Sequence, residues 1–171
     1  MNTRPDIAYA VGVLSRHASN PSYNACKLCV YLLQYLRGSV HKGIRFSGRT
    51  FDMHVFTDAD WTGDKLSRKS TTGFVAFACG GPVAWQSKLQ TTVATSSKES
   101  EYMAMYYAGM QELVWLRGVL KEVGLPCCEP TPFFLDSQSA EVVELVGGFY
   151  RILLFLLCRF SCHCYLHDFT S

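Results

Sequence analysis

The sequence predicts an α/β domain built on a mixed sheet, in which an antiparallel three-strand meander is joined by a parallel fourth strand and flanked by helices. Three observations predict this fold. Residues 53–58 alternate in polarity with a period of two, residues 71–87 contain two further alternating runs joined by a Gly-Gly turn, and a long helical segment separates them from a short apolar run at 132–136. Because that helix makes a crossover connection, the last run is expected to lie parallel to the first.

Helices are expected on both sides of this pattern. One is predicted at 5–17, with Pro5 near its start, and a second at about 23–37 with leucines along one side. The pair is too small to stand alone and should pack on another element. A further helix is predicted to begin at Ser137, a good N-cap residue, and to end at the glycine pair 147–148.

The long helix has recognisable ends. Ser96 is expected to cap it, with Glu99 completing a capping box, and Gly124 is expected to end it. At about 100° per residue, Glu101 lies on the same side as Trp115, and the other sides are also apolar. These patterns predict a helix that is buried nearly all round, with Glu101 facing inward.

The chain is expected to divide into three parts. Residues 1–46 form a helical segment, residues 47–147 the α/β domain, and residues 148–171 an apolar tail to which no structure is assigned. The tail's apolar run is interrupted by Arg151 and Arg159 and is short for a membrane span, so no membrane partner is expected.

Composition excludes some classes of protein. A formal charge of +2 argues against a long-range electrostatic attraction to nucleic acid, although a local basic patch is compatible with it. No basic and then apolar leader opens the sequence, so the protein is expected to be intracellular and not secreted. The eight cysteines are accordingly expected to be reduced thiols, with Cys26 and Cys29 buried and inert.

Three aspartates crowd the end of the first predicted strand. In "HVFTDADWTGD", Asp58 belongs to the strand, while Asp60 and Asp64 are expected in the following loop, where their charge is solvated. The stretch resembles the opening of a calcium-binding loop, but Lys69 stands at the twelfth position, where a bidentate Glu belongs. A calcium-binding role is therefore disfavoured.

Acidic residues recur at one edge of the predicted sheet. If the first and last strands are parallel neighbours, Asp58 and Asp136 lie side by side at their carboxyl ends, and Glu101 at the start of the long helix can join them. Three close carboxylates repel one another unless cations neutralise them. Oxygen-only ligands suit Mg²⁺ or Mn²⁺, which predicts a divalent metal site of the kind used in phosphodiester hydrolysis.

The same residues carry a family resemblance. "FTDADWTGD", "RKSTTGFVAF", "VAWQSKLQTTVATSSKESEYMA" and "FFLDSQSA" resemble the ribonuclease H domain of copia-type retrotransposon polyproteins, and "TRPDIAYAVGVLSRHASNPS" with "LLQYLRGS" resembles the end of the preceding reverse transcriptase. The resemblance covers about residues 3–141. It implies a ribonuclease H-like fold that uses divalent metal to cleave the RNA strand of RNA–DNA hybrids as part of a larger polyprotein. The family's acidic residues fall on Asp58, Glu101 and Asp136.

The sequence departs from the family near its end. The family continues into a stretch that supplies a fourth metal-site carboxylate, whereas position 157 here is Leu157, and Asp168 lacks the family's context. The polymerase residues of the family are not found, so no polymerase activity is expected. This departure predicts hydrolysis that is impaired by a truncated C-terminus, and the alternative function is an inactive retroelement remnant that at most binds nucleic acid.

Side chains in the loops beside this edge are candidates for nucleic-acid contact. Basic groups could meet phosphates, and hydroxyls could reach the sugars, where the 2′-OH distinguishes RNA from DNA. Trp61 is a candidate for stacking, whereas Trp85 is expected in the core. The predicted nucleic-acid-binding residues are Lys65, Arg68, Lys69, Ser70, Thr71, with Thr72 beside them, and Lys88.

Overall fold

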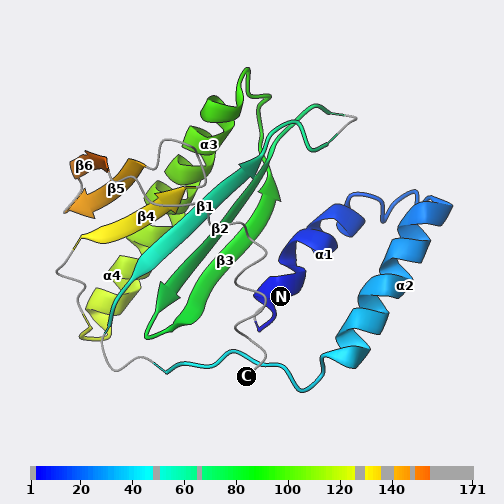
Figure 1. Cartoon of the computed structure of the whole chain (residues 1–171), viewed down its shortest axis with the longest axis horizontal. Helices are drawn as coiled ribbons and strands as arrows, with labels where there is room; N and C mark the ends of the chain where they lie inside the picture. The colour runs from blue at the N-terminus through cyan, green and yellow to red at the C-terminus, as the bar shows by residue number, and fades with distance from the viewer. Residues whose placement is uncertain are drawn as a thin grey trace.

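A mixed sheet forms the centre of the protein in a computed structural model that describes residues 3–47, 51–64, 67–125, 130–135, 141–146 and 149–154. The strands are β1 (His54–Asp60), β2 (Thr71–Ala78), β3 (Gly81–Leu89), β4 (Thr131–Leu135), β5 (Glu141–Val146) and β6 (Phe149–Leu154). Their order across the sheet is β3-β2-β1-β4-β5-β6 (Figure 1).

The predicted meander and parallel strand are both confirmed. β1 and β3 each pair with β2 in antiparallel fashion, and β1 pairs with β4 in parallel. The turn between β2 and β3 has positive φ at Cys79 (53°) and Gly80 (74°). Two successive positive φ angles are typical of the two-residue hairpin turn whose twist matches that of the flanking strands.

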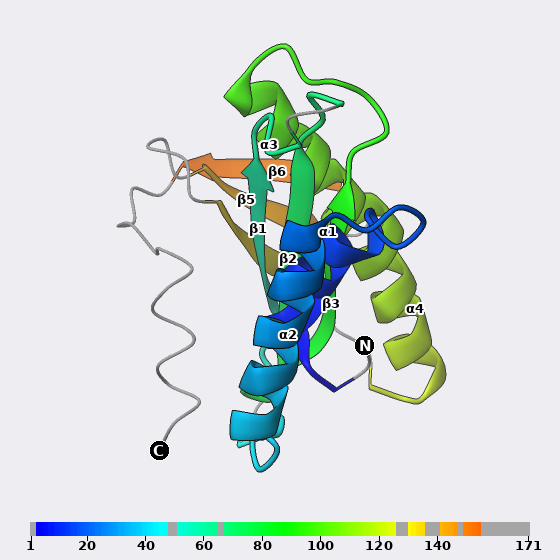
Figure 2. The same cartoon turned by 90° about the vertical axis from the view of Figure 1, so that its right-hand side faces the viewer.

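The helices are η1 (Pro5–Ile7), α1 (Ala8–Ser15), α2 (Tyr23–Gly38), α3 (Ser97–Tyr106), η2 (Tyr107–Leu113) and α4 (Val114–Glu122). α3 and α4 lie along one face of the sheet, and α1 and α2 lie together beside the edge strand β3 (Figures 1 and 2). No helix among the described residues combines the length and the apolar character that crossing a membrane requires.

The core lies between α3–α4 and the sheet. Period-two alternation turns Met53 and Val55 toward the helices, and Ala104 and Ala108 let the helix approach closely. The buried cluster is completed from β2, η2 and β4, and consists of Met53, Val55, Phe74, Ala76, Ala108, Leu113 and Phe133. The other face of the sheet carries an aromatic group, in which His54 stacks on Phe77 with ring centroids 5.2 Å apart and Phe56 stacks on Phe134 at 5.0 Å.

The long helix is not the regular, wholly buried helix that was predicted. Its middle segment, η2, is a π-helix, in which hydrogen bonds run from i to i+5 and shift the side chains around the axis. Trp115 is consequently 62% exposed, Tyr106 is also exposed, and Leu113 instead enters the core at 2%. The prediction that this helix is buried nearly all round was therefore wrong.

The predicted helix that begins at Ser137 was also wrong. Residues 137–140 lie outside the described residues, and residues 141–146 form strand β5, antiparallel to β4 and paired with β6. Val142, Val143 and Val146 are β-branched, a residue class that favours strands, and an apolar run this short can form either structure. β6 falls in the segment that had no assigned structure.

The short helix η1 and helix α2 are joined by a polar network. Arg4 forms a salt bridge with Asp6 at 2.8 Å and donates to the carbonyl of Ser39, while the Tyr35 hydroxyl donates to Asp6 at 2.7 Å. These bonds lower the pKa of Asp6 from its ordinary value, chiefly through Arg4. α1 packs on β3, which meets the expectation that the pair rests on another element.

The outer helix of that pair is less buried than the sequence indicated. α2 buries only Ala25 among its residues, while Leu28 and Leu33 are exposed. Cys26 and Cys29 are exposed free thiols, so the expectation of buried cysteines was wrong at both positions.

Candidate active site

Three chain segments converge at one end of the sheet. The carboxyl ends of β1 and β4 point to the same end, and α3 begins there (Figure 1). In the parallel ladder, Thr57 of β1 pairs with Leu135, the last residue of β4. In the sequence, Asp58 directly follows Thr57 and Asp136 directly follows Leu135. Asp136 itself lies outside the described residues.

Asp58 is exposed on β1. Its alternation with Thr57 and Val55 turns it to the side of the strand opposite the core. One carboxylate oxygen, Oδ1, accepts a hydrogen bond from the backbone N–H of Ala59 at 2.8 Å. Asp60, two residues further along, is also exposed, and the structure extends β1 as far as this residue rather than ending it at Asp58.

Glu101 lies in the first turns of α3 and is half-buried. The buried face of the helix is centred on Ser100 and Ala104, each 0% exposed, so Glu101 lies at the flank of that face. The prediction that Glu101 points inward is corrected to this flanking position. α3 packs against β1, the strand that carries Asp58.

The start of α3 is held by its N-terminal hydrogen bonds. The hydroxyl of Ser96 accepts from the N–H of Glu99 at 3.2 Å, as the predicted cap requires. The Glu99 carboxylate accepts hydrogen bonds from the N–H and the hydroxyl of Thr95, at 2.6 and 2.5 Å. In a capping box it would instead accept from the N–H of the N-cap residue, Ser96. These bonds lower the pKa of Glu99.

The loop after β1 carries two of the predicted basic contacts, and the third, Lys65, lies outside the described residues. Arg68 is exposed and has a positive φ of 59°, and its N–H donates to the carbonyl of Asp64 at 2.8 Å. Lys69 is half-buried. Asp64 also accepts a hydrogen bond from the Ser67 hydroxyl, so its carboxylate organises this loop.

The hydroxyl groups of Ser70 and Thr71, which were predicted to contact nucleic acid, form hydrogen bonds within the protein. Ser70 and Thr71 are buried, at 0% and 4% exposed. The Ser70 hydroxyl accepts from the N–H of Thr62 at 3.3 Å, and the Thr71 hydroxyl accepts from Arg16 at 3.3 Å. Contact of these two hydroxyls with a substrate stays a prediction.

Lys88 lies on β3 and turns toward the helices. Its Nζ donates to the Tyr107 hydroxyl at 3.3 Å and lies 5.3 Å from the centre of that ring, a cation–π distance. Lys88 is exposed, so the ammonium group remains accessible from solvent.

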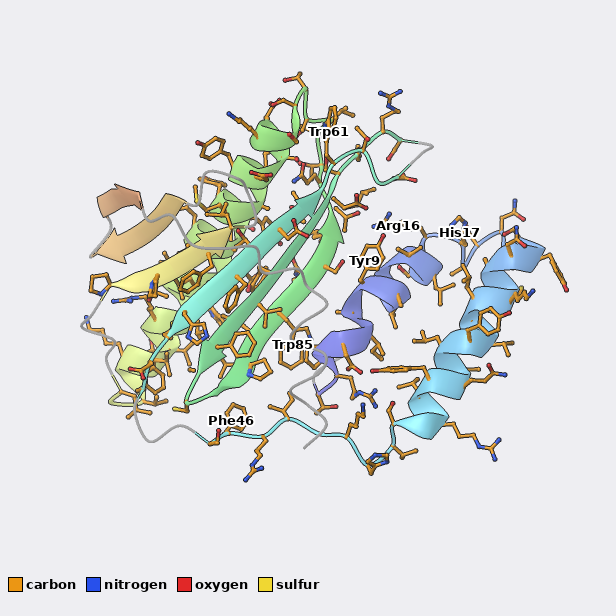
Figure 3. All side chains as sticks on the ribbon, viewed as in Figure 1. Tyr9, Arg16, His17, Phe46, Trp61 and Trp85 are labelled. Carbon is orange, nitrogen blue, oxygen red and sulfur yellow. The ribbon has the colours of Figure 1, made fainter. Side chains whose placement is uncertain are left out.

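The two tryptophans differ in exposure. Trp61 is 47% exposed at the end of the sheet where α3 begins, and its indole N–H donates to the carbonyl of Ala94 at 3.4 Å (Figure 3). Trp85 is half-buried between β3 and α1 (Figure 3).

Sequence reasoning missed two residues that shape this end of the sheet. Arg16, at the end of α1, reaches Thr71 at the start of β2. Gln90 is buried and bonds both β2 and α3 through its side chain. A glutamine directly after a predicted strand was the only signal that the sequence offered for Gln90. The contact of Arg16 depends on how α1 packs, which the sequence does not show.

The donor set matches hard divalent cations in its chemistry. Asp58 and Glu101 offer only carboxylate oxygens, the ligands that Mg²⁺ and Mn²⁺ prefer. Among the residues that the structure describes, no three His, Cys, Asp or Glu side chains are grouped closely enough to hold a metal. The expected third ligand, Asp136, belongs to the part of the chain outside that description.

Comparison with known proteins identifies relatives over most of this chain. The Retrovirus-related Pol polyprotein from transposon TNT 1-94 of Nicotiana tabacum is 44% identical over 138 residues, which are 81% of this chain and 10% of that polyprotein. The corresponding polyprotein from transposon RE1 of Arabidopsis thaliana is 35% identical over 139 residues, 81% of this chain and 9% of that protein. The chain therefore spans about a tenth of the length of these two relatives.

A shorter relative is matched over most of its own length. Secreted RxLR effector protein 161 of Plasmopara viticola is 47% identical over 115 residues, which are 67% of this chain and 80% of that protein. No family model matches the chain. No solved structure gives a significant match.

Proposed function

The chain belongs to the same family as these segments of transposon Pol polyproteins, and from this premise we propose that it is a copia-type ribonuclease H-like domain that hydrolyses the RNA strand of RNA–DNA hybrids. The observation that carries the proposal is the parallel pairing of Thr57 with Leu135. It brings the two strands that lead into Asp58 and Asp136 to adjacent positions at one end of the sheet, and α3 with Glu101 begins at that same end.

Asp58, Glu101 and Asp136 would hold Mg²⁺ or Mn²⁺. When bound, such ions activate a water molecule and stabilise the leaving oxygen in phosphodiester hydrolysis. Asp58 is exposed and can reach a bound substrate directly, whereas Glu101 is half-buried and fixed by the capped first turn of α3. The chain thus provides one accessible and one more rigid carboxylate at this end.

The surrounding residues suit a nucleic-acid backbone. Exposed Arg68 and half-buried Lys69 lie in the loop after β1 and are proposed to contact phosphates. Trp61, exposed at the same end, offers an aromatic surface to a sugar or base. In a longer polyprotein this domain would act on hybrids produced by the preceding polymerase.

The proposal is tested with an RNA–DNA hybrid labelled on its RNA strand, incubated with the purified chain in Mg²⁺ and separately in Mn²⁺. Asp58→Asn removes the central ligand, and Asp60→Asn is a matched control because both aspartates are exposed on β1 and lie two residues apart. We expect cleavage by the wild-type chain and the Asp60 variant but not by the Asp58 variant.

Two results would overturn the proposal. If the Asp58 and Asp60 variants lost cleavage equally, the result would contradict a specific role of Asp58 as a metal ligand. A folded wild-type chain that cleaves in neither metal would instead favour the inactive remnant, which at most binds nucleic acid, and a filter-binding measurement with the same hybrid would then show whether binding survives.

A further inference from the structure

Gln90 occupies a junction between the sheet and α3. It directly follows β3, and its backbone N–H donates to the carbonyl of Ser70 at 2.8 Å. The residue is 9% exposed, so its amide side chain is held away from solvent under the first turns of α3.

The side chain connects two elements that carry the proposed ligands. Its Nε2 donates to the Thr72 hydroxyl at 3.1 Å and to the Ser100 carbonyl at 2.9 Å. Ser100 directly precedes Glu101, and Thr72 pairs across the sheet with Ala59, which directly follows Asp58. The Gln90 amide thus connects the backbone of α3 next to Glu101 with strand β2, which pairs with β1 next to Asp58.

The hydrogen bonds of the Gln90 amide satisfy its nitrogen but not its oxygen. Among the described residues, the buried Gln90 Oε1 has no hydrogen-bond partner, and the same holds for Thr57 Oγ1 and Gln86 Oε1 in the sheet. An unpartnered buried oxygen carries a desolvation penalty that an apolar side chain of similar size would avoid. Polar bonds inside a core fix one arrangement of the elements they join.

We propose that Gln90 is a positioning residue that sets the height and rotation of the first turns of α3 on the sheet, and through them the place of Glu101 relative to Asp58. This proposal rests on the function proposed above. Gln90 itself is not expected to touch the substrate, because it is buried beneath the helix.

Gln90→Met tests the proposal by keeping the length of the side chain and removing its hydrogen bonds. Gln86→Met is the matched control, since Gln86 lies four residues earlier on β3 and faces the same side of the sheet. Its side-chain oxygen is also buried with no hydrogen-bond partner among the described residues. If Gln90→Met does not fold, Thr72→Val removes the other end of the same link and carries the same expectations.

The first two measurements do not depend on cleavage. Amide hydrogen exchange at residues 100–104 should become about tenfold faster in Gln90→Met. The affinity for Mn²⁺ alone, measured by calorimetry, should fall by roughly 10- to 100-fold, as is typical when a group that orients a ligand is lost. In the cleavage assay kcat should fall over the same range while KM for the hybrid is unchanged. Gln86→Met should match the wild type in all three.

The outcomes separate the two proposals. If the wild-type chain binds Mn²⁺ and cleaves the hybrid, and Gln90→Met exchanges faster but binds and cleaves like the wild type, Gln90 is only structural and the positioning role is overturned. If the wild-type chain neither binds Mn²⁺ nor cleaves, the proposed function fails, and with it the proposed effect of Gln90 on metal binding and cleavage. The exchange data then still report whether Gln90 holds α3.

Discussion

Replacing Leu113 and Trp115 by alanine, one at a time, tests the unusual turn in the long helix. In a regular α-helix, Trp115 would lie about 20° around the axis from buried Ala104, and Leu113 about 180° from it. The π-segment takes up an additional residue in its turn and rotates the residues C-terminal to it by roughly 100°. That rotation places Leu113 about 80° from Ala104 on the side of buried Ala108, and Trp115 about 80° from Ala104 on the other side. Leu113 is accordingly 2% exposed and Trp115 62% exposed.

The two substitutions should differ widely in cost. Leu113 belongs to the buried cluster beside Ala108 and Phe133, and truncating a fully buried leucine lowers the free energy of unfolding by about 2–5 kcal/mol. Trp115→Ala removes a larger side chain that lies mostly in solvent, so its cost should stay below about 1 kcal/mol.

Urea unfolding followed by circular dichroism measures both costs from the shift in midpoint at a common slope. The slope itself is a control, because an altered slope would indicate a changed unfolded state or an intermediate. If Trp115→Ala were the more destabilising of the two, the helix would be regular and the assignment of its buried face would be refuted.

The other predictions concern His54 on the aromatic face of the sheet and two glycines, one at the start of β3 and one in α4. Burial lowers the pKa of His54 from its ordinary value of 6.5, so the unfolded chain takes up the proton first and stability is lost as the pH falls through that value. His54→Phe should therefore lose less stability than the wild type between pH 7.5 and 5.5, and equal losses by urea unfolding would contradict this. Gly81→Ala should destabilise the protein by about 1–3 kcal/mol, because its Cβ would lie 2.8 Å from the Arg45 carbonyl oxygen. Gly118→Ala in α4, where a Cβ meets nothing within 4 Å, should instead stabilise by about 0.5–1 kcal/mol, and thermal unfolding in which both variants shift the same way would contradict the pair.

The sheet could be predicted because its signals are local. Met53, Val55 and Thr57 alternate with polar or half-exposed neighbours, and the structure buries all three. The tight turn within the sequence CGGP and the crossover helix then leave few possible arrangements for the strands, since a crossover of this length favours parallel pairing. The α/β class and the order of the first four strands follow from these features.

The errors arose where tertiary contacts decide between local alternatives. Nothing in the residues from Tyr107 to Leu113 distinguishes a π-segment from an α-helix, because the choice depends on which side chains the sheet accepts. Residues 141–146 form a strand because β4 offers a free edge with which they pair. A short apolar run has no period long enough to reveal that partner.

The sequence predicted which strands lead to the candidate site, but not the directions in which its side chains point. Asp58 and the parallel register followed from the pattern of strands, whereas the flanking position of Glu101 depends on how α3 rotates on the sheet. Ser70 and Thr71 were assigned to substrate on side-chain chemistry alone. Their burial results from contacts with Thr62 and Arg16 that sequence spacing does not reveal.

The most direct test of the proposed function is to measure which strand of which duplex the protein cleaves. One nucleotide sequence is prepared as an RNA–DNA hybrid, a DNA duplex and an RNA duplex, and each strand is labelled in turn. In Mg²⁺ the wild-type chain should cut only the RNA strand of the hybrid, and chelation with EDTA should stop the reaction. Cutting of the DNA strand, equal cutting of all three duplexes, or cleavage that persists in EDTA would contradict a metal-dependent ribonuclease specific for hybrids.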